Sequence, residues 1–566
     1  MKHEQWFVKR LFWPLFIPSL LSALGLAIGA VADSFYIGRT MSDMGLFIIG
    51  AASPIYMVYT ALSVGIAAGG AIHFAAAMSK GGAEEGRKIF RSVIIFDQLV
   101  ICTLTVIGLI FARPLVVLLG GAPGSETYAE MLGYVRLMLI TTPILFMQAP
   151  LEYFVHTDNN PKLASLAMVA GTVVDCLSGY LFIVVLDVGI CGSIYATVCG
   201  ALVMESVSLC HFIFRKGTLR LEKLGEISGR TAWQAFVTGF ATAAQYIYQF
   251  VILLCFNRVL LALDGESAVA AYDIVVNAAS LVTAVFDAIV LAIIPLVSTF
   301  FGERNREGLK ESLKISLTTG VAVTAVGAGL LVLFAAQYCS FAGLSEGYLP
   351  FGVLAMRWYM ASMVLAGINS IVSAYFQNIG CEKLSYAIMG MRGLIVLLPC
   401  GILCAGGGYD AFWSCYIITE SLVFLFIVGY LLWRKKGKSV LEFNDRDVFS
   451  ETFVGSCATI ASTCERIQDF LSERGVSMEK AYFITLGVEE TCQLIGESNG
   501  ELMIQLTLVC EKEDFVLHVR DNAYAVNPFE LDEEDDRMLS LMIVKDQAKD
   551  FYYRQYVGFN TLTIVF

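Results

Sequence analysis

The run ASLVTAVFDAIVLAIIPLVSTF, residues 279–300, decides which class of fold this chain can adopt. Its single charged side chain is Asp287, and the rest is apolar or small. A bilayer core requires about 20 apolar residues per helix, so the run predicts a membrane-spanning helix. The whole chain has the same character, since 57% of its 566 residues are hydrophobic and 16% are charged. Ordinary soluble enzymes, collagen-like chains and disordered chains are excluded by this composition.

Outward from this run, the same length criterion predicts twelve membrane-spanning helices before Arg434. Their expected ranges are 11–32, 45–74, 92–119, 131–151, 162–186, 189–214, 233–262, 267–300, 315–336, 349–375, 384–406 and 411–433. The first range carries no small-residue cleavage pattern, so we expect a retained helix rather than a signal peptide.

The charges divide the chain into a membrane body and a tail. After Lys438 there are 10 Lys and Arg against 24 Asp and Glu, a net charge of −14, whereas the whole chain carries −12. Nucleic acid is excluded as a partner of the tail, because phosphate contacts need clustered Lys and Arg. We expect two lobes, 1–222 and 223–438, and a soluble domain, 439–566. Most of the 15 cysteines lie in apolar runs and are interpreted as packing residues.

The loop charges predict the orientation of the body in the inner cell membrane. Of the Lys and Arg residues in the predicted loops, 22 fall on the side of the N-terminus, and only Arg39 and Arg113 fall on the other side. Because cytoplasmic loops carry the excess of Lys and Arg, both termini and the tail are expected in the cytoplasm.

The body repeats itself with an offset near 222 residues. Glu85-Gly86-x-Lys88 matches Glu307-Gly308-x-Lys310, and Tyr153-Phe154 matches Tyr375-Phe376. Six helices per repeat give both lobes the same orientation, with a cavity between them and alternating access as the expected mechanism.

Carboxylates at membrane depth are functional candidates, because ionisable groups are costly to bury in a bilayer. Asp33 and Asp175 lie among apolar and small residues, and neither has an acidic counterpart at the repeat offset. Asp287 is a third candidate, while Asp97 and Asp273 lie nearer the ends of their spans. Further candidates are the counter-ions or anion ligands Arg136, Arg258 and Arg357 and the cavity aromatics Tyr36, Tyr56, Phe146, Tyr246, Phe256 and Phe286. We interpret His73 as a packing residue.

The body resembles the multidrug and toxic compound extrusion (MATE) family of secondary transporters over residues 8–435. The resemblance rests on Asp33-Ser-Phe-Tyr-Ile-Gly-Arg39, on Gly65-x-x-x-Gly69-Gly70, on Ala196-Thr197 and on Asn257. It implies exchange of a proton or sodium ion for an organic, cationic, drug-like or toxic compound. The candidate ion and substrate residues are Asp33, Asp175, Thr197, Asn257 and Asp287. Gly171 stands where many relatives have Asn, and we favour a proton site in the first lobe.

The tail is predicted to be a two-layer α/β domain. Helices are expected at 457–474, 478–495 and 538–549, and strands at 502–509, 515–520 and 560–566, with a solvated acidic run at 532–536. The tail resembles anti-sigma-factor serine kinases, which have the histidine-kinase-like ATPase fold.

The resemblance rests on Leu486-Gly-Val-Glu489-Glu490 and Val519-Arg-Asp521-Asn522, and it implies a nucleotide site at Glu489, Glu490, Asp521 and Asn522. The family's metal-binding Asn and its glycine-rich phosphate loop are both replaced, the latter by Arg537-Met-Leu-Ser-Leu541. We therefore expect no phosphotransfer and doubtful ATP binding, with the tail kept for regulation or for a cytoplasmic partner protein.

The first hypothesis for the whole chain is an ion-coupled efflux antiporter without enzymatic activity. A flippase for a lipid-linked intermediate would be favoured if Arg136, Arg258 and Arg357 faced the cavity. A membrane sensor that signals through the tail is the third hypothesis.

Overall fold

A computed structural model describes residues 2–79, 82–119, 123, 126–214, 217–219, 227–264, 266–341, 349–435, 447–496, 502–511, 514–523, 538–556 and 558–566. Within these ranges, twelve helical segments are long and apolar enough to cross a membrane, which confirms the expected number. The segments match the predicted ranges to within several residues; the eighth, for example, is Ile274–Gly302.

The first half of the body is built on one very long helix. Its elements are α1 (Lys2–Ser79), α2 (Ala83–Ile110), α3 (Ala112–Leu118), α4 (Glu126–Leu145), α5 (Gln148–Thr157), α6 (Pro161–Gly179), η1 (Tyr180–Val185) and α7 (Cys191–Ile213). A straight helix of the 78 residues of α1 would be about 117 Å long, several times the thickness of a bilayer core. Instead α1 doubles back. Its two ends lie close together, since Glu4 bonds to Asn305 and Ser79 lies against nearby Gly302. The first two predicted spans are therefore the two arms of α1.

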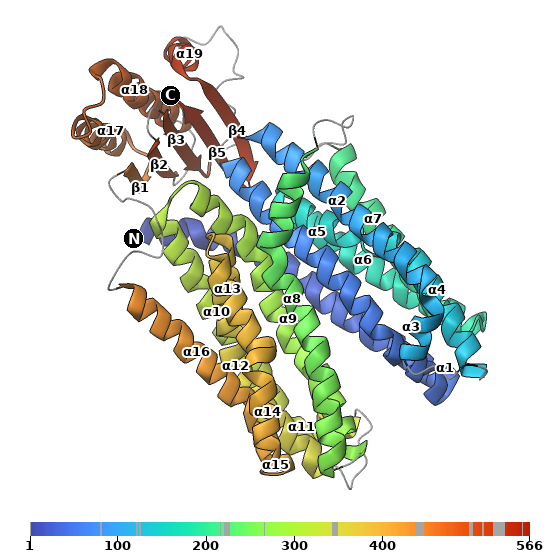
Figure 1. Cartoon of the computed structure of the whole chain (residues 1–566). Helices are drawn as coiled ribbons and strands as arrows, with labels where there is room; N and C mark the ends of the chain where they lie inside the picture. Colours follow the sequence, from blue (N-terminus) through green and yellow to red (C-terminus); the bar gives the residue numbers. More distant parts are fainter. Residues whose placement is uncertain are drawn as a thin grey trace.

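The second half repeats the pattern with a different first pair. Its elements are α8 (Gly229–Asp264), α9 (Glu266–Gly302), α10 (Arg306–Leu333), α11 (Ala335–Phe341), α12 (Leu349–Asn378), α13 (Glu382–Gly390), η2 (Met391–Ile395), α14 (Leu397–Ala405), α15 (Tyr409–Phe412) and α16 (Ser414–Lys435). Below, the end of the body that carries the tail is called the tail side, and the opposite end the far side. In Figure 1 the helices of the two halves lie together at the tail side and diverge toward the far side.

Small residues bring the two halves together at the tail side. A Cβ added at Gly69 of α1 would lie 1.8 Å from the carbonyl oxygen of Ala235 in α8, and one at Gly239 would lie 1.8 Å from that of Gly65. Only glycine allows helix backbones to approach so closely, and small residues spaced four apart are typical of membrane helix contacts. Beside this crossing, His73 bonds to Thr238, and Thr238 donates to Glu382 of α13.

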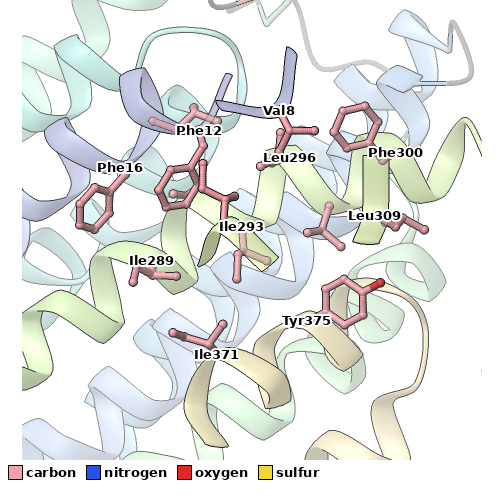
Figure 2. Close-up of a cluster of buried hydrophobic side chains, with 14 of the residues drawn as sticks. Val8, Phe12, Phe16, Ile289, Ile293, Leu296, Phe300, Leu309, Ile371 and Tyr375 are labelled. Atoms are coloured by element: carbon pink, nitrogen blue, oxygen red, sulfur yellow. The ribbon is translucent and has the colours of Figure 1, made fainter. Parts of the chain in front are cut away.

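The start of α1 is part of the second half's hydrophobic core. Figure 2 shows Val8, Phe12 and Phe16 facing Ile293 and Leu296 of α9, and all five side chains are nearly inaccessible to solvent. The start of α1 therefore packs with the second half, whereas residues around Ile48 and Tyr59 belong to a separate core in the first half.

The tail is a five-stranded antiparallel sheet with helices on one face. Its elements are β1 (Val448–Val454), α17 (Cys457–Ser472), α18 (Met478–Gly496), β2 (Met503–Glu511), β3 (Asp514–Asp521), α19 (Met538–Gln547), β4 (Asp550–Tyr556) and β5 (Phe559–Val565), in the sheet order β1-β2-β3-β5-β4. Alternate residues such as Leu506, Leu517 and Ile564 bury one face against α17, α18 and α19.

The predicted helices and strands of the tail are all present, and two further strands were not predicted. These are β1 and β4, the two edges of the sheet. The expected helix 538–549 ends at Gln547, and the chain continues directly into β4. The acidic run 532–536 and residue 537 lie outside the described residues. The tail rests on the tail side of the body with the helix-free face of its sheet (Figure 1).

Candidate functional site

Two clusters of polar residues lie within the membrane-spanning helices of the body. The first is built where α6 crosses α7 through Gly171 and Gly200. A Cβ at Gly171 would lie 2.7 Å from the Gly200 carbonyl oxygen, and one at Gly200 would lie 2.8 Å from Cβ of Asp175. Residue 171 is glycine, then, because the backbone of α7 occupies the space that a side chain would need. This approach brings Asp175 into hydrogen-bond contact with Thr197.

Asp175 and Thr197 suit a group that gains and loses a proton. The Thr197 hydroxyl has one proton, which it can donate to the Ser193 carbonyl 3.0 Å away or to an ionised Asp175. When it donates to Ser193, its oxygen remains free to accept a hydrogen bond from a neutral Asp175. The other carboxyl oxygen, Oδ1 of Asp175, is buried without a hydrogen-bond partner among the described residues. An unpartnered carboxylate is costly at this depth unless it binds a cation or a proton.

The helix that carries Asp33 runs beside this cluster. Gly29 of α1 lies against Thr172 of α6, and the Tyr36 ring lies 6.2 Å from that of Tyr180 in η1. Gly29 and Tyr36 are seven residues apart on α1, and their neighbours Thr172 and Tyr180 are eight residues apart on α6 and η1. The two segments therefore run side by side in the same direction. This register places the Asp33 backbone at the level of Asp175, while the Asp33 side chain lies outside the described part of the structure. We call these residues, with Thr197, the first-lobe acid site.

The second cluster joins the two halves, and we call it the interlobe cluster. It consists of Glu152 and Tyr153 on α5, Tyr246 on α8, Asp287 on α9 and Tyr56 on α1. The carboxylates of Asp287 and Glu152 both interact electrostatically with the hydroxyl groups of Tyr153 and Tyr246, and Tyr56 interacts with Tyr246. Two acidic side chains and three phenol rings thus lie within electrostatic range of one another between the halves.

The interlobe cluster lies next to an apolar contact between the two halves. One turn toward the tail side from Asp287, Leu291 and Ile294 pack on Ala71 and Ile72, with Tyr153 against them. This apolar contact closes the space below the cluster. The Asp287 side chain is nevertheless exposed, although it lies in the middle of a spanning helix. The Asp287 carboxylate is therefore not sealed inside the apolar contact.

Glu152 was not predicted from the sequence. The expected fourth span ended at residue 151, whereas the observed segment continues to Thr157. The helix is interrupted after Leu145 and a second helix, α5, starts at Gln148. Because α5 continues the spanning segment, Glu152 lies within it, and this interruption is the signal that was missed. At the repeat offset of 222, Glu152 corresponds to Ala374, so the acid is peculiar to the first half.

The remaining candidates of the body are scattered. Asn257 lies on α8 with its side-chain oxygen buried and without a partner among the described residues, and Asp97 of α2 is fully buried with one oxygen in the same state. Phe256 and Phe286 belong to the core of the second half, and Phe146 stacks on Tyr59. The side chain of Asp273 lies outside the described residues.

The three membrane arginines take no part in either cluster within the described structure. Arg136, Arg258 and Arg357 are exposed, and among the described residues none forms an ion pair with the carboxylates above. Arg392, which was not predicted, does form an ion pair within a spanning helix and lies 3.0 Å from Glu420.

The predicted nucleotide residues of the tail lie on its helix-covered side. Glu489 accepts a hydrogen bond from Gln493, one turn further along α18. The Asp521 carboxyl accepts bonds from the Asn560 side chain and the Ala523 backbone, each at 2.8 Å. Burial raises the pKa of Asp521 to about 6.

The neighbouring candidates differ in their surroundings. Asn522 accepts from the Met503 backbone at 2.7 Å, and Glu490 is half-buried. Asp521 and Asn522 are therefore engaged in holding the ends of β2, β3 and β5 together.

Comparisons with known proteins agree with this architecture. The family model MatE matches residues 18–181 and 238–402. Multidrug export protein MepA of Staphylococcus saprophyticus is 22% identical over 428 residues, which cover 74% of this chain and 92% of MepA. Probable multidrug resistance protein YoeA of Bacillus subtilis is 21% identical over 384 residues, 65% of this chain and 80% of YoeA.

Among solved structures, the Vibrio cholerae MATE transporter VcmN superimposes with a TM-score of 0.70 at 19% identity. The match covers 78% of this chain and 100% of VcmN. The body therefore has the MATE fold, and the uncovered part is about as long as the tail.

Proposed function

Because the chain belongs to the MatE family and is a secondary transporter rather than an enzyme, we propose that it exports drug-like or toxic organic compounds in exchange for an ion. The printed names of MepA and YoeA, a multidrug exporter and a probable multidrug resistance protein, support this class of substrate. Export proceeds by alternating access, in which the halves close on one side as they open on the other.

The interlobe cluster carries the proposal. Glu152 and Asp287 supply negative charge, and Tyr56, Tyr153 and Tyr246 supply aromatic faces and hydroxyl groups between the halves. Carboxylates and aromatic faces both attract organic cations, and the attraction is strongest where water is scarce. Cationic organic compounds are the substrates that this chemistry favours.

Coupling is assigned to the first-lobe acid site. The unpartnered oxygen of Asp175 and the reversible hydrogen bond of Thr197 favour a proton as the coupling ion, with sodium as the alternative. Asp33 is the second acid of this site, since the register of α1 on α6 brings its backbone to the same level.

The excess of Lys and Arg in the loops near the termini supports a cytoplasmic location for both ends and for the tail. With this orientation, the tail side is the cytoplasmic side, and the halves are closed to the cytoplasm. The tail is proposed to regulate transport, and the engaged carboxyl groups of Glu489 and Asp521 argue against phosphotransfer by it.

Counterflow in proteoliposomes with an imposed proton or sodium gradient tests the proposal. In Asp287→Asn and Glu152→Gln, uptake of an organic cation should fall at least about tenfold, the factor for one lost charged contact. In Asp175→Asn, counterflow of the organic cation should no longer depend on the imposed proton or sodium gradient. Asp410→Asn, an exposed acid at the far side, is the matched control and should transport normally. Full transport by the Asp287 and Glu152 variants would refute the assignment of the cluster.

A further inference from the structure

The helix-free face of the tail sheet is bound to the second half of the body through a buried ion pair. Nη2 of Arg520 on β3 lies 2.5 Å from Oε1 of Glu303, which directly follows α9, and the two side chains are only 5% and 2% exposed. Nη1 of Arg520 donates to Gln505 on β2, and Gln505 donates to Glu4 at the start of α1. Thr452 on β1 donates to the other oxygen of Glu4.

Apolar contacts surround this ion pair. The Phe559 ring of β5 lies 5.1 Å from Phe7 and 6.2 Å from Trp6, and the Arg520 guanidinium lies 5.2 Å from the Phe300 ring. Phe559 is 3% exposed and belongs to the same core as the start of α1. Water is therefore excluded from the Arg520–Glu303 contact, which we call the second-half anchor.

The same face of the sheet is also bound to the first half. Nη2 of Arg554 on β4 donates to the carbonyl of Thr157 at 3.0 Å and lies 3.7 Å from Oδ1 of Asp158, at the end of α5. Asp158 is fully buried, and its other oxygen lies 2.9 Å from Nε2 of His211 of α7. Asn159 donates to the backbone of Gln555. We call the Arg554–Asp158 contact the first-half anchor.

One residue of the sheet separates the two arginines. Arg520 on β3 and Arg554 on β4 both pair with Thr561 on the strand between them, β5. Directly paired residues point to the same face, and adjacent strands lie about 4.8 Å apart, so the two Cα atoms are held about 10 Å apart. A hydrogen-bonded sheet does not stretch, and this spacing is therefore a fixed distance between Glu303 of one half and Asp158 of the other.

We propose that the tail is an intramolecular clamp that holds the two halves closed at the tail side. The proposal rests on the alternating access proposed above, in which the halves must separate at that side for substrate to enter. Separation by more than the reach of the two side chains breaks one anchor. Either buried Glu303 loses its arginine, or Arg554 loses both Asp158 and the Thr157 carbonyl, while Asp158 keeps its bonds to His211, Thr218 and Leu219. Such a loss is strongly unfavourable, so the docked tail favours the closed state and slows the cycle.

Full-length Arg520→Gln and Arg554→Gln variants test the clamp at its two anchors separately. Hydrogen exchange of the backbone amides in 66–79 of α1 and 235–243 of α8 reports opening of the tail side. We expect exchange there to rise about tenfold in each variant, since one charge-assisted hydrogen bond is lost, and the initial rate of counterflow to rise as well.

Arg466→Gln is the matched control, because Arg466 also pairs with a glutamate of the tail, Glu451, but is 51% exposed and forms no described contact with the body. If Arg520→Gln does not fold, the double variant Glu303→Gln/Arg520→Gln removes both charges of the anchor at once. Unchanged exchange in 66–79 and 235–243 in folded variants of both anchors would overturn the clamp. Hydrogen exchange needs no substrate, so absence of transport in the wild type would refute only the proposed function.

Discussion

At the scale of single residues, the acids of the body fall into two groups, those that lie beside an arginine and those that have no basic partner among the described residues. Glu303 and Asp158, at the tail side, each face an arginine of the tail. Asp175 and Asp287, deeper in the body, have no such partner among the described residues. A paired carboxylate holds two parts of the structure together, whereas an unpaired one at membrane depth is a candidate to bind a proton or a cation.

One buried histidine makes the docked face of the tail sensitive to acid. His518 of β3 bonds to Thr563 at 3.0 Å, and burial, followed by the charge of Arg520, lowers its pKa from 6.5 to about 3. The folded state thus binds fewer protons than the unfolded state between these values. The contribution of His518 to the free energy of unfolding is therefore complete above pH 6.5 and is lost as the pH falls toward 3.

We therefore expect the thermal unfolding midpoint of the tail to fall as the pH is lowered from 7 to 4, by an amount that corresponds to a few kcal/mol. His518→Gln should reduce this dependence, because glutamine keeps a hydrogen bond but does not titrate. Calorimetry of the full chain at several pH values measures the effect, and His3→Gln, at an exposed site, is the control. Equal slopes in the two variants would contradict the role of His518.

At the scale of elements, glycine positions determine which helices meet. Gly171 and Gly200 bring α6 onto α7, and Gly69 and Gly239 bring α1 onto α8. The first crossing lies within one half and positions Asp175. The second lies between the halves, so the closeness of α1 and α8 is a property of the closed state.

The α1–α8 crossing predicts a specific effect of one methyl group. Gly239→Ala places a Cβ 1.8 Å from the Gly65 carbonyl, so the two helices must separate at the tail side. Unlike loss of an anchor, which leaves the helices able to close, the added methyl group prevents full closure, so we expect slower counterflow and a loss of stability of roughly 1–3 kcal/mol, the usual cost of overpacking. Gly329→Ala in α10 is the control, since its Cβ meets no atom within 4 Å. Normal transport by Gly239→Ala would show that the close approach is not required.

At the scale of the whole molecule, the sequence predicted the pieces better than their contacts. Twelve spans and six tail elements were predicted because apolar runs and short-range periodicity are local signals. β1 and β4 were missed, since their alternation is weak and their strand form depends on pairing with β2 and β5. These two edges carry Thr452 and Arg554, so the missed strands are also part of the surface that binds the body.

The residues of the candidate site were also predicted only in part. Asp175, Thr197 and Asp287 were found because acids and hydroxyls stand out in apolar runs. Glu152 was not, because the break between α4 and α5 extends the fourth span beyond the apolar run. Glu152 and Asp287 lie 135 positions apart and act on the same two tyrosines, Tyr153 and Tyr246, which no local pattern predicts.

The two anchors together predict how the tail leaves the body. With one anchor removed, the other keeps the tail close at a high effective concentration, so the tail should remain bound. Only Arg520→Gln/Arg554→Gln should release it, which resonance energy transfer between labels on the tail and on the far side of the body would detect as a lower efficiency. Release by either single variant would show that the anchors do not act together.

The position of Glu4 has a consequence for how the molecule is made. Its carboxylate binds Thr452 and Gln505, residues 448 and 501 positions later in the chain. Contacts between the first and last parts of a chain form only after synthesis has delivered both, and closing so long a loop is slow. The body is thus inserted and folded before the tail can dock, and a newly made transporter passes through an unrestrained period that ends when its own C-terminal domain arrives.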